Sequence, residues 1–159
     1  MPSTDYSPEE PKPLGGYAML TLIFNGLVAA LALAHARSRR SLPERIPTRD
    51  IALLGLATFK LSRIITKDKV TSFVRAPFTR YEGRAGPAEV SEEPRGRGLR
   101  YAIGELVVCP YCIGQWIGTG LLGAYLYKPR ATRAVASLFA IVTVADYLQQ
   151  AWAAVDKAA

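Results

Sequence analysis

The chain has 159 residues, of which 50% are hydrophobic and 21% are charged, with a formal net charge of +7. A chain of this length forms one ordinary domain. The charges gather in connections between long apolar runs, which excludes a typical soluble domain and indicates a membrane protein. Excess arginine predicts contact with anionic lipid headgroups. Nucleic acid is not expected as a partner, because no basic stretch carries interleaved aromatic residues.

The N-terminal region contains a tail and a first apolar segment. Residues 1–13 are rich in proline and acidic residues and are expected to form a flexible tail. Residues 14–36 are predicted to be a transmembrane helix, because no charge occurs over the length of about 20 residues that a span requires. A cleaved signal peptide is the alternative, but the acidic leading segment favours a retained anchor. The arginines that follow predict a cytoplasmic loop.

The next segment, Ile51–Ile65, is less apolar. Only residues 51–59 are free of charge, which is too short for a span. Its apolar residues share one helical face, while Lys60, Arg63 and Lys67 line the opposite face. This pattern is typical of an amphipathic helix in the membrane interface. A short membrane helix that packs against the others is the alternative.

A long basic connection, residues 66–100, follows and is rich in glycine and proline. Its stretch Glu92–Gly98 is predicted to form neither a helix nor a strand. A loop of this length in so small a protein is either disordered or functional. Arg95, Arg97 and Arg100 are candidate contacts for a phosphate or lipid headgroup, the alternative being a flexible solvated turn.

Two further spans are predicted in the C-terminal half. Residues 106–127 carry no charge and contain Gly114 and Gly118, whose spacing lets two helices pack closely. Trp116 lies between these glycines and is assigned to the same packing surface. Residues 134–155 form the third span, which Asp146 interrupts. A carboxylate within a span is a candidate functional group, and the cations on Ile51–Ile65 are its expected partners.

These segments predict an all-α helical integral membrane protein. We expect three transmembrane helices plus one amphipathic or short membrane helix, with residues 51–155 forming the main membrane domain. Lipid admits only helices or closed barrels, and these apolar runs do not alternate as barrel strands do.

The two cysteines of the chain occur in the sequence Cys-Pro-Tyr-Cys at residues 109–112. The string matches the redox motif C-x-x-C, although no strand is predicted before it. If one helix continues through the proline, Glu105, Cys109, Cys112 and Trp116 share one face beside a kink. The alternatives are two small packing residues or a structural disulfide. Metal binding is least favoured, because the chain offers too few ligands.

The order of several motifs resembles a family of small bacterial proteins known as domain of unknown function 1360. The matching motifs are Phe59–Asp68, Val74–Phe78, Glu92–Gly98, Gly104–Leu106, and Cys109–Gly114 followed by Trp116. The resemblance covers residues from Ile51 to the last span and leaves the first helix outside. It implies a multi-pass protein of the bacterial plasma membrane with unassigned activity, and it supplies no mechanism.

Three functions are compatible with these observations. The favoured one is a non-enzymatic protein whose glycine-faced helices bind a membrane protein partner or a second copy of the chain. The second is a thiol–disulfide protein with Cys109 as the attacking thiol, Cys112 as the resolving thiol and Glu105 as a proton acceptor. The third is a small transporter or channel that uses Asp146 with Lys60 or Arg63. No cofactor and no metal are expected.

Overall fold

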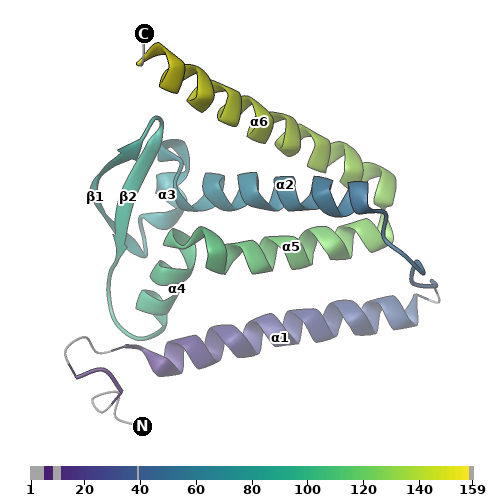
Figure 1. Cartoon of the computed structure of the whole chain (residues 1–159). Coiled ribbons are helices and arrows are strands. Elements are labelled where there is room, and N and C mark those ends of the chain that lie inside the picture. The colour runs from purple at the N-terminus through teal and green to yellow at the C-terminus, as the bar shows by residue number, and fades with distance from the viewer. Residues whose placement is uncertain (1–5, 9–11, 39, 158–159) are drawn as a thin grey trace. The chain divides into compact units, whose positions relative to one another are not determined.

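Most of the described chain is helical (Figure 1). The computed structural model describes residues 6–8, 12–38 and 40–157. In these ranges the elements are, in chain order, α1 (Leu14–Arg37), α2 (Thr48–Thr66), the 3-10 helix η1 (Lys69–Thr71), α3 (Ser72–Arg75), β1 (Thr79–Gly86), β2 (Glu89–Pro94), α4 (Leu99–Val108), α5 (Pro110–Tyr127) and α6 (Pro129–Asp156). The strands pair as an antiparallel hairpin, so the all-α expectation is corrected to a mostly helical protein with a small sheet. The tail predicted for residues 1–13 lies largely outside the described residues.

Two described helices, α1 and α6, are long and apolar enough to cross a membrane. The helices α4 and α5 pass the same test only together, as a bent pair. Within the described ranges α2 does not pass it, in line with the weak apolar character of its sequence. The expected count of three spans is therefore met only if the bent pair counts as one span.

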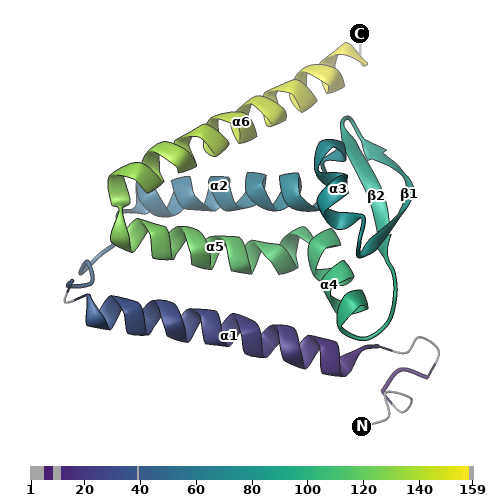
Figure 2. The ribbon, with the colours of Figure 1, turned by 180° about the vertical axis from the view of Figure 1, so that it is seen from behind.

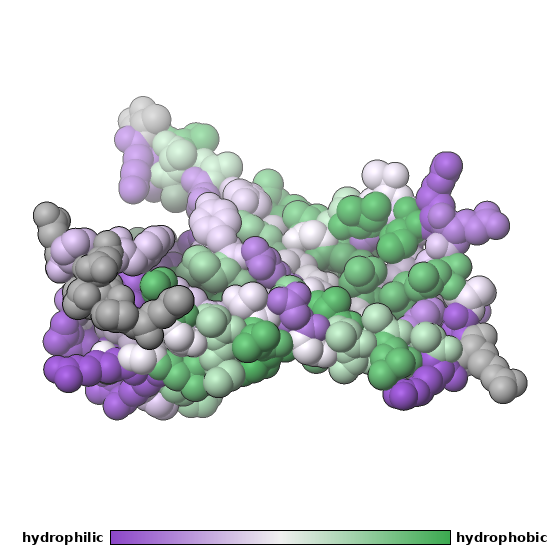
Figure 3. Space-filling view, turned by 90° about the horizontal axis from the view of Figure 1, so that it is seen from below, coloured by the Kyte–Doolittle hydropathy of each residue, from purple (hydrophilic) through white to green (hydrophobic). Residues whose placement is uncertain are grey.

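The first helix buries almost none of its side chains within the protein. Of its residues only Gly16 is buried, and Leu22 and Ile23 remain 69% and 50% exposed. Figure 3 shows many hydrophobic residues on the surface of this view, with some hydrophilic residues among them. A helix that exposes apolar side chains all round requires an apolar medium such as lipid.

The chain divides into two compact units, residues 1–40 with 64–113 and residues 41–63 with 114–159. In the first unit, α1 runs beside α4 in both ribbon views (Figures 1 and 2). Their contact is close, because a Cβ atom added to Gly16 would lie 2.8 Å from the Cβ atom of Ala102. The absence of a side chain at Gly16 therefore allows α1 to approach α4.

A buried arginine holds the hairpin to the helices of the first unit. Arg75 of α3 is 0% exposed. Its guanidinium donates to both carboxylate oxygens of Glu92 on β2, at 2.8 and 3.1 Å, and to the carbonyl of Ile65 in α2 at 2.6 Å. Charged groups are buried only when paired in this way. The pair fixes the hairpin within a segment that was expected to be irregular.

The prediction that Glu92–Gly98 forms no strand is wrong for its first three residues, which belong to β2. Pro94 is the last residue of that strand, a position where its missing N–H disrupts the ladder least. Gly96 and Gly98 have φ angles of 94° and 56°. These left-handed conformations end the extended segment, as glycine permits, and α4 begins at the next residue.

In the second unit a polar cluster joins the start of α2 to α5 and α6. Asp50 accepts hydrogen bonds from the Tyr125 hydroxyl at 2.6 Å and from the Arg133 guanidinium at 2.8 and 3.0 Å. The side chain of Asp50 is only 3% exposed. The bonds from Arg133 and Tyr125 lower the pKa of Asp50 from 3.8 to about 2. This carboxylate is therefore a structural anchor for three helices.

Candidate functional site

The site begins at a break between two helices. The first, α4, ends at Val108, Cys109 is extended with φ −102° and ψ 105°, and α5 begins at Pro110. A proline disfavours helical backbone at the residue before it, and its missing N–H is tolerated at the first position of a helix. Pro110 therefore ends one helix and opens the next. The single-helix stripe of Glu105, Cys109, Cys112 and Trp116 is wrong for this reason.

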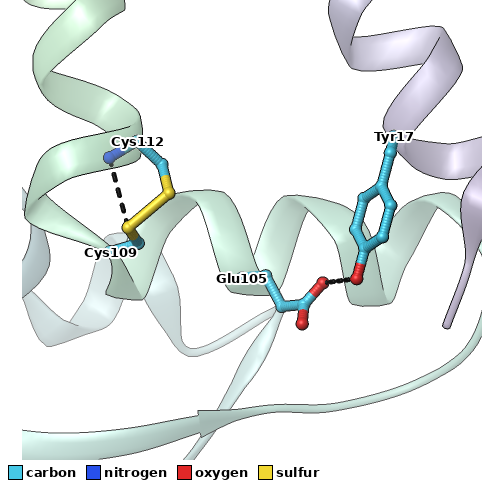
Figure 4. The surroundings of a disulfide bond; sticks show 4 residues. All are labelled: Tyr17, Glu105, Cys109 and Cys112. Carbon is cyan, nitrogen blue, oxygen red and sulfur yellow. Dashed lines mark hydrogen bonds between the residues drawn. A yellow bond between two sulfur atoms is a disulfide. The ribbon is translucent and has the colours of Figure 1, made fainter.

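A disulfide joins the two cysteines at this break (Figure 4). Their Cα atoms lie 5.3 Å apart. The backbone N–H of Cys112 donates to Sγ of Cys109 at 3.2 Å, and the carbonyl of Cys109 accepts from the N–H of Ile113 at 3.1 Å. Cys109 thus occupies the N-cap position of α5, where a side-chain acceptor meets the free N–H groups of the first turn.

The helix terminus favours negative charge on Cys109. The first turn of a helix carries a partial positive charge, which stabilises a thiolate over a thiol. Cys109 is half-buried, whereas Cys112 is exposed and Tyr111 between them is 87% exposed. The alternative of two buried packing residues does not fit this exposure. The two cysteines therefore form a disulfide at a helix N-terminus, preceded by α4 rather than by a strand.

Glu105 lies on α4, one turn before the break. The hydroxyl of Tyr17 on α1 donates a hydrogen bond to its carboxylate (Figure 4). The ammonium of Lys12 lies 4.0 Å from the other carboxylate oxygen. Glu105 points toward α1 in this view, and its two partners come from a part of the sequence that carried no signal for them, because 88 residues separate Tyr17 from Glu105.

A pocket of about 620 Å³ connects these groups within the first unit. Residues of α1, α4 and β2 line it, together with Lys12 and both cysteines. Both cysteines therefore line one hollow together with Glu105, Tyr17 and Lys12. Among the described residues no group of three or more histidine, cysteine or acidic side chains is placed to hold a metal ion.

The two glycines of the predicted packing surface face another helix of the same chain. The nearest side chain to a Cβ atom added at Gly114 or Gly118 is that of Thr58 on α2, at 4.0 and 3.8 Å. Trp116, between them on α5, is half-buried. The glycine spacing therefore serves an internal helix contact in the second unit.

Asp146 of α6 is paired with Lys60 of α2. The Lys60 ammonium lies 2.8 Å from a carboxylate oxygen of Asp146, and their side chains are 13% and 39% exposed. Arg63, the other expected partner, lies over the ring of Phe59 at 5.9 Å. The pair joins two helices of the second unit across 86 residues of sequence.

Two of the three loop arginines brace the backbone. Arg95 donates to the carbonyl of Ala76 at 2.7 Å, and Arg100 donates twice to the carbonyl of Pro77, at 2.9 and 2.6 Å. Arg97 is exposed. Binding of a headgroup or phosphate by these residues stays a prediction.

The comparisons with known proteins agree with the order of motifs. The family described as "Protein of unknown function (DUF1360)" matches residues 53–152. Two relatives come from Bacillus subtilis (strain 168). "Sporulation protein YjcA" is 30% identical over 102 residues, covering 62% of this chain and 86% of the relative. "UPF0713 protein YngL" is 26% identical over 111 residues, covering 68% and 82%. No solved structure matches significantly.

Proposed function

Since the chain belongs to the family of proteins of unknown function DUF1360, we propose for it the activity that its helix break supports best: thiol–disulfide exchange at a bacterial membrane. The Cys109–Cys112 pair is the redox centre. The observation that carries this proposal is the N-cap position of Cys109, whose sulfur accepts the N–H of Cys112.

The exchange proceeds in two steps. In the reducing direction, the Cys109 thiolate attacks a disulfide of a partner protein; a mixed disulfide forms, the partner disulfide breaks and one partner thiolate leaves. The Cys112 thiolate then attacks Sγ of Cys109, restoring the internal disulfide and releasing the second partner thiolate. The partner gains two electrons, and two protons pass from the cysteine pair to the partner thiols. The oxidising direction is the reverse.

The residues around the pair have supporting roles. The N–H of Cys112 and the start of α5 stabilise the Cys109 thiolate, which is both the attacking group and the better leaving group. Exposed Cys112 and Tyr111 leave the pair open to a large partner. Glu105 is held by Tyr17 and Lys12, and we assign it a proton-accepting role on the pocket side.

The plasma membrane is the proposed location. The relatives are bacterial, and α1 and α6 have the length and composition of spans. The bent pair α4–α5 would then enter the membrane as a third, broken span or as a re-entrant segment. Anionic headgroups would neutralise the excess of arginine and lysine.

Binding of a partner helix is a second candidate function. The glycines that first suggested it face Thr58 in the same chain, so the surface must be another one. Exposed apolar side chains on α6 favour that face: Ile141, Leu148 and Trp152 are 67%, 65% and 73% exposed. Replacing all three with serine should convert a detergent-stable oligomer to the monomer in a sizing experiment; an unchanged elution volume would remove this candidate.

The redox proposal is tested by titration of the purified protein in detergent. The protein is equilibrated in glutathione buffers of graded potential, and free thiols are labelled with a maleimide that shifts the mass on a gel. We expect one two-electron transition between dithiol and disulfide, at a potential between about −120 and −270 mV, the range of catalytic pairs.

Two single variants sharpen this titration. Cys112→Ser should accumulate a mixed disulfide of Cys109 with glutathione, because the resolving thiol is missing. Cys109→Ser is the matched control and should accumulate less, because Cys112 lacks the N-cap position. Thiols that label fully without reduction in isolated membranes, together with no mixed disulfide in either variant, would contradict the proposal.

A further inference from the structure

The pocket beside the disulfide has the composition of a site for a small lipid-soluble redox partner. We propose that it binds a quinone, which oxidises the Cys109–Cys112 dithiol back to the disulfide. This inference rests on the proposed thiol–disulfide function and names the electron acceptor for the same site. A pair that oxidises partner dithiols becomes reduced at each turnover and requires such an acceptor.

Position is the first argument. Both cysteines line the pocket of about 620 Å³, so a molecule bound there would lie next to the disulfide. Ligand pockets in proteins have volumes of about 300–1,000 Å³, and a quinone ring with its first isoprenoid unit fits this range. The opposite wall is α1, held close to α4 at Gly16 and Ala102. The pocket is therefore a built feature of the first unit.

Chemical character is the second argument. Leu20, Leu106 and Val108 supply apolar walls, and Tyr101 supplies an aromatic ring. The α1 wall belongs to a helix apolar enough to span a membrane, which favours a ligand that arrives from lipid. A quinone has this character, since its flat ring and isoprenoid tail are apolar.

Polar groups at the pocket complete the match. A quinone has two carbonyl oxygens, which each take up a proton on reduction. Lys12 also lines the pocket, and its ammonium lies 4.0 Å from a carboxylate oxygen of Glu105. The carboxylate of Glu105 can relay a proton, and Tyr17 holds that carboxylate in place. These groups supply hydrogen bonds to the oxygens and a route for the protons.

The reaction balances as follows. The two thiols of Cys109 and Cys112 lose two protons and two electrons, and a sulfur–sulfur bond forms between them. The quinone gains the two electrons and two protons and becomes a hydroquinone, with one O–H bond at each former carbonyl. The Cys109 thiolate at the start of α5, stabilised by the N–H of Cys112, is the group that donates electrons to the quinone.

The test uses the reduced full-length protein in detergent, without oxygen, and duroquinone as the probe. Duroquinone is fully substituted on its ring, so thiols do not add irreversibly to a free ring position. We expect one mole of quinone reduced for each mole of disulfide formed, followed by ultraviolet absorbance and by maleimide labelling. The rate should saturate with quinone concentration, as it does for a bound reactant.

Two pocket-filling variants, Leu20→Trp on α1 and Leu106→Trp on α4, separate this inference from the proposed function. Each should slow duroquinone reduction by about tenfold or more, because the indole occupies the pocket. Each should leave the glutathione titration of the cysteine pair unchanged, which also shows that the variant folds. Two positions are used so that a variant that fails to fold leaves the other to decide.

The outcomes distinguish the two ideas. Normal glutathione exchange with duroquinone rates equal in wild type and both filled variants overturns the quinone site and leaves the exchange function standing. Slower reaction of the filled variants with a peptide dithiol, but not with duroquinone, also overturns it and assigns the pocket to a polypeptide. Absence of both reactions overturns both proposals.

Discussion

Two helices in the C-terminal half begin at a proline, and the two joints that precede them differ in what holds them. At the first, Cys109 precedes Pro110 and caps α5 with its sulfur, which is bonded to the exposed Cys112. At the second, Lys128 precedes Pro129 and makes no side-chain cap. The second joint is secured instead by the cluster of Asp50 with Tyr125 and Arg133.

On the proposed function, the difference separates a joint that carries out exchange from a structural one. The same backbone device opens both helices, since proline fits the first helical position in each case. At the second joint Asp50 and Tyr125 are buried and Arg133 is partly exposed, and the three groups satisfy one another, so they stabilise the fold. At the first joint the acceptor is the sulfur of Cys109, whose disulfide bond to Cys112 can be broken and formed again. Variants of the two joints should therefore affect different observables.

The largest expected effect is loss of exchange at the first joint. Cys109→Ser should abolish the two-electron exchange with glutathione, because serine forms no disulfide and the remaining Cys112 can only form a mixed disulfide. Thermal stability should change little, since a disulfide that closes so short a loop constrains the unfolded chain weakly. The exchange rate is measured by quenching samples at set times with the mass-shifting maleimide. The stability is measured by a thermal melt in detergent. A large loss of stability would make the disulfide structural.

The next effect is loss of stability at the second joint. Asp50→Ala should lower the melting temperature by about 5 °C or more, because Arg133 and Tyr125 lose their buried acceptor. Exchange at Cys109 should stay at the wild-type rate under conditions where the variant is folded. Asp50→Asn retains one acceptor oxygen and should fall between wild type and alanine. Equal melting temperatures for all three proteins would refute the anchoring role.

A smaller effect is expected within α5, which connects the joints. Gly118→Leu should destabilise the chain by about 1–3 kcal/mol, because the added side chain meets Thr58 of α2. Gly120→Leu is the matched control, since no atom lies within 4 Å of a Cβ atom there. Thermal melts and sizing of both variants distinguish an internal contact from an oligomer contact. A changed oligomer with an unchanged melt would favour the latter.

The smallest effect on stability is expected from acid, and it separates the joints by pH. The pKa of Asp50 is lowered to about 2 in the fold, so its contribution is fully present above its unfolded value of 3.8 and is lost only as the pH falls toward 2. Exchange depends on thiolate, so it should be slower at pH 5 than at pH 8. Melts and exchange rates at pH 5 and 8 check this difference.

The two apolar helices at the ends of the chain could be predicted, because residues 14–34 carry no charge and residues 134–155 carry only one, Asp146. The break at Cys109 was also readable, since Pro110 disfavours helix at the residue before it. The sequence predicts a kink there, and it does not predict the N-cap that Cys109 forms for α5. The hairpin could not be predicted, because its strands hold two β-bulges and little alternation, and it depends on the buried Arg75–Glu92 pair.

The long-range partners of the site had no local signal. Tyr17 and Glu105 are 88 residues apart, and Asp50 and Arg133 are 83 apart. The charges at helix ends were interpreted as contacts for lipid headgroups, which is their usual role. The contact of Lys60 with Asp146 was foreseen because a carboxylate within an apolar run requires a partner. The sequence thus predicts an ion pair only where a charged residue, such as Asp146, interrupts an apolar run.

The position of α1 has an evolutionary consequence. The segment shared with the family covers residues 53–152 and includes both cysteines and Glu105, whereas Tyr17 and Leu20 lie before it. One wall of the pocket thus belongs to the inherited core and the facing wall to a helix outside it. On the proposed function, replacing that helix in this chain should leave the potential of the cysteine pair unchanged and alter which molecules enter the pocket.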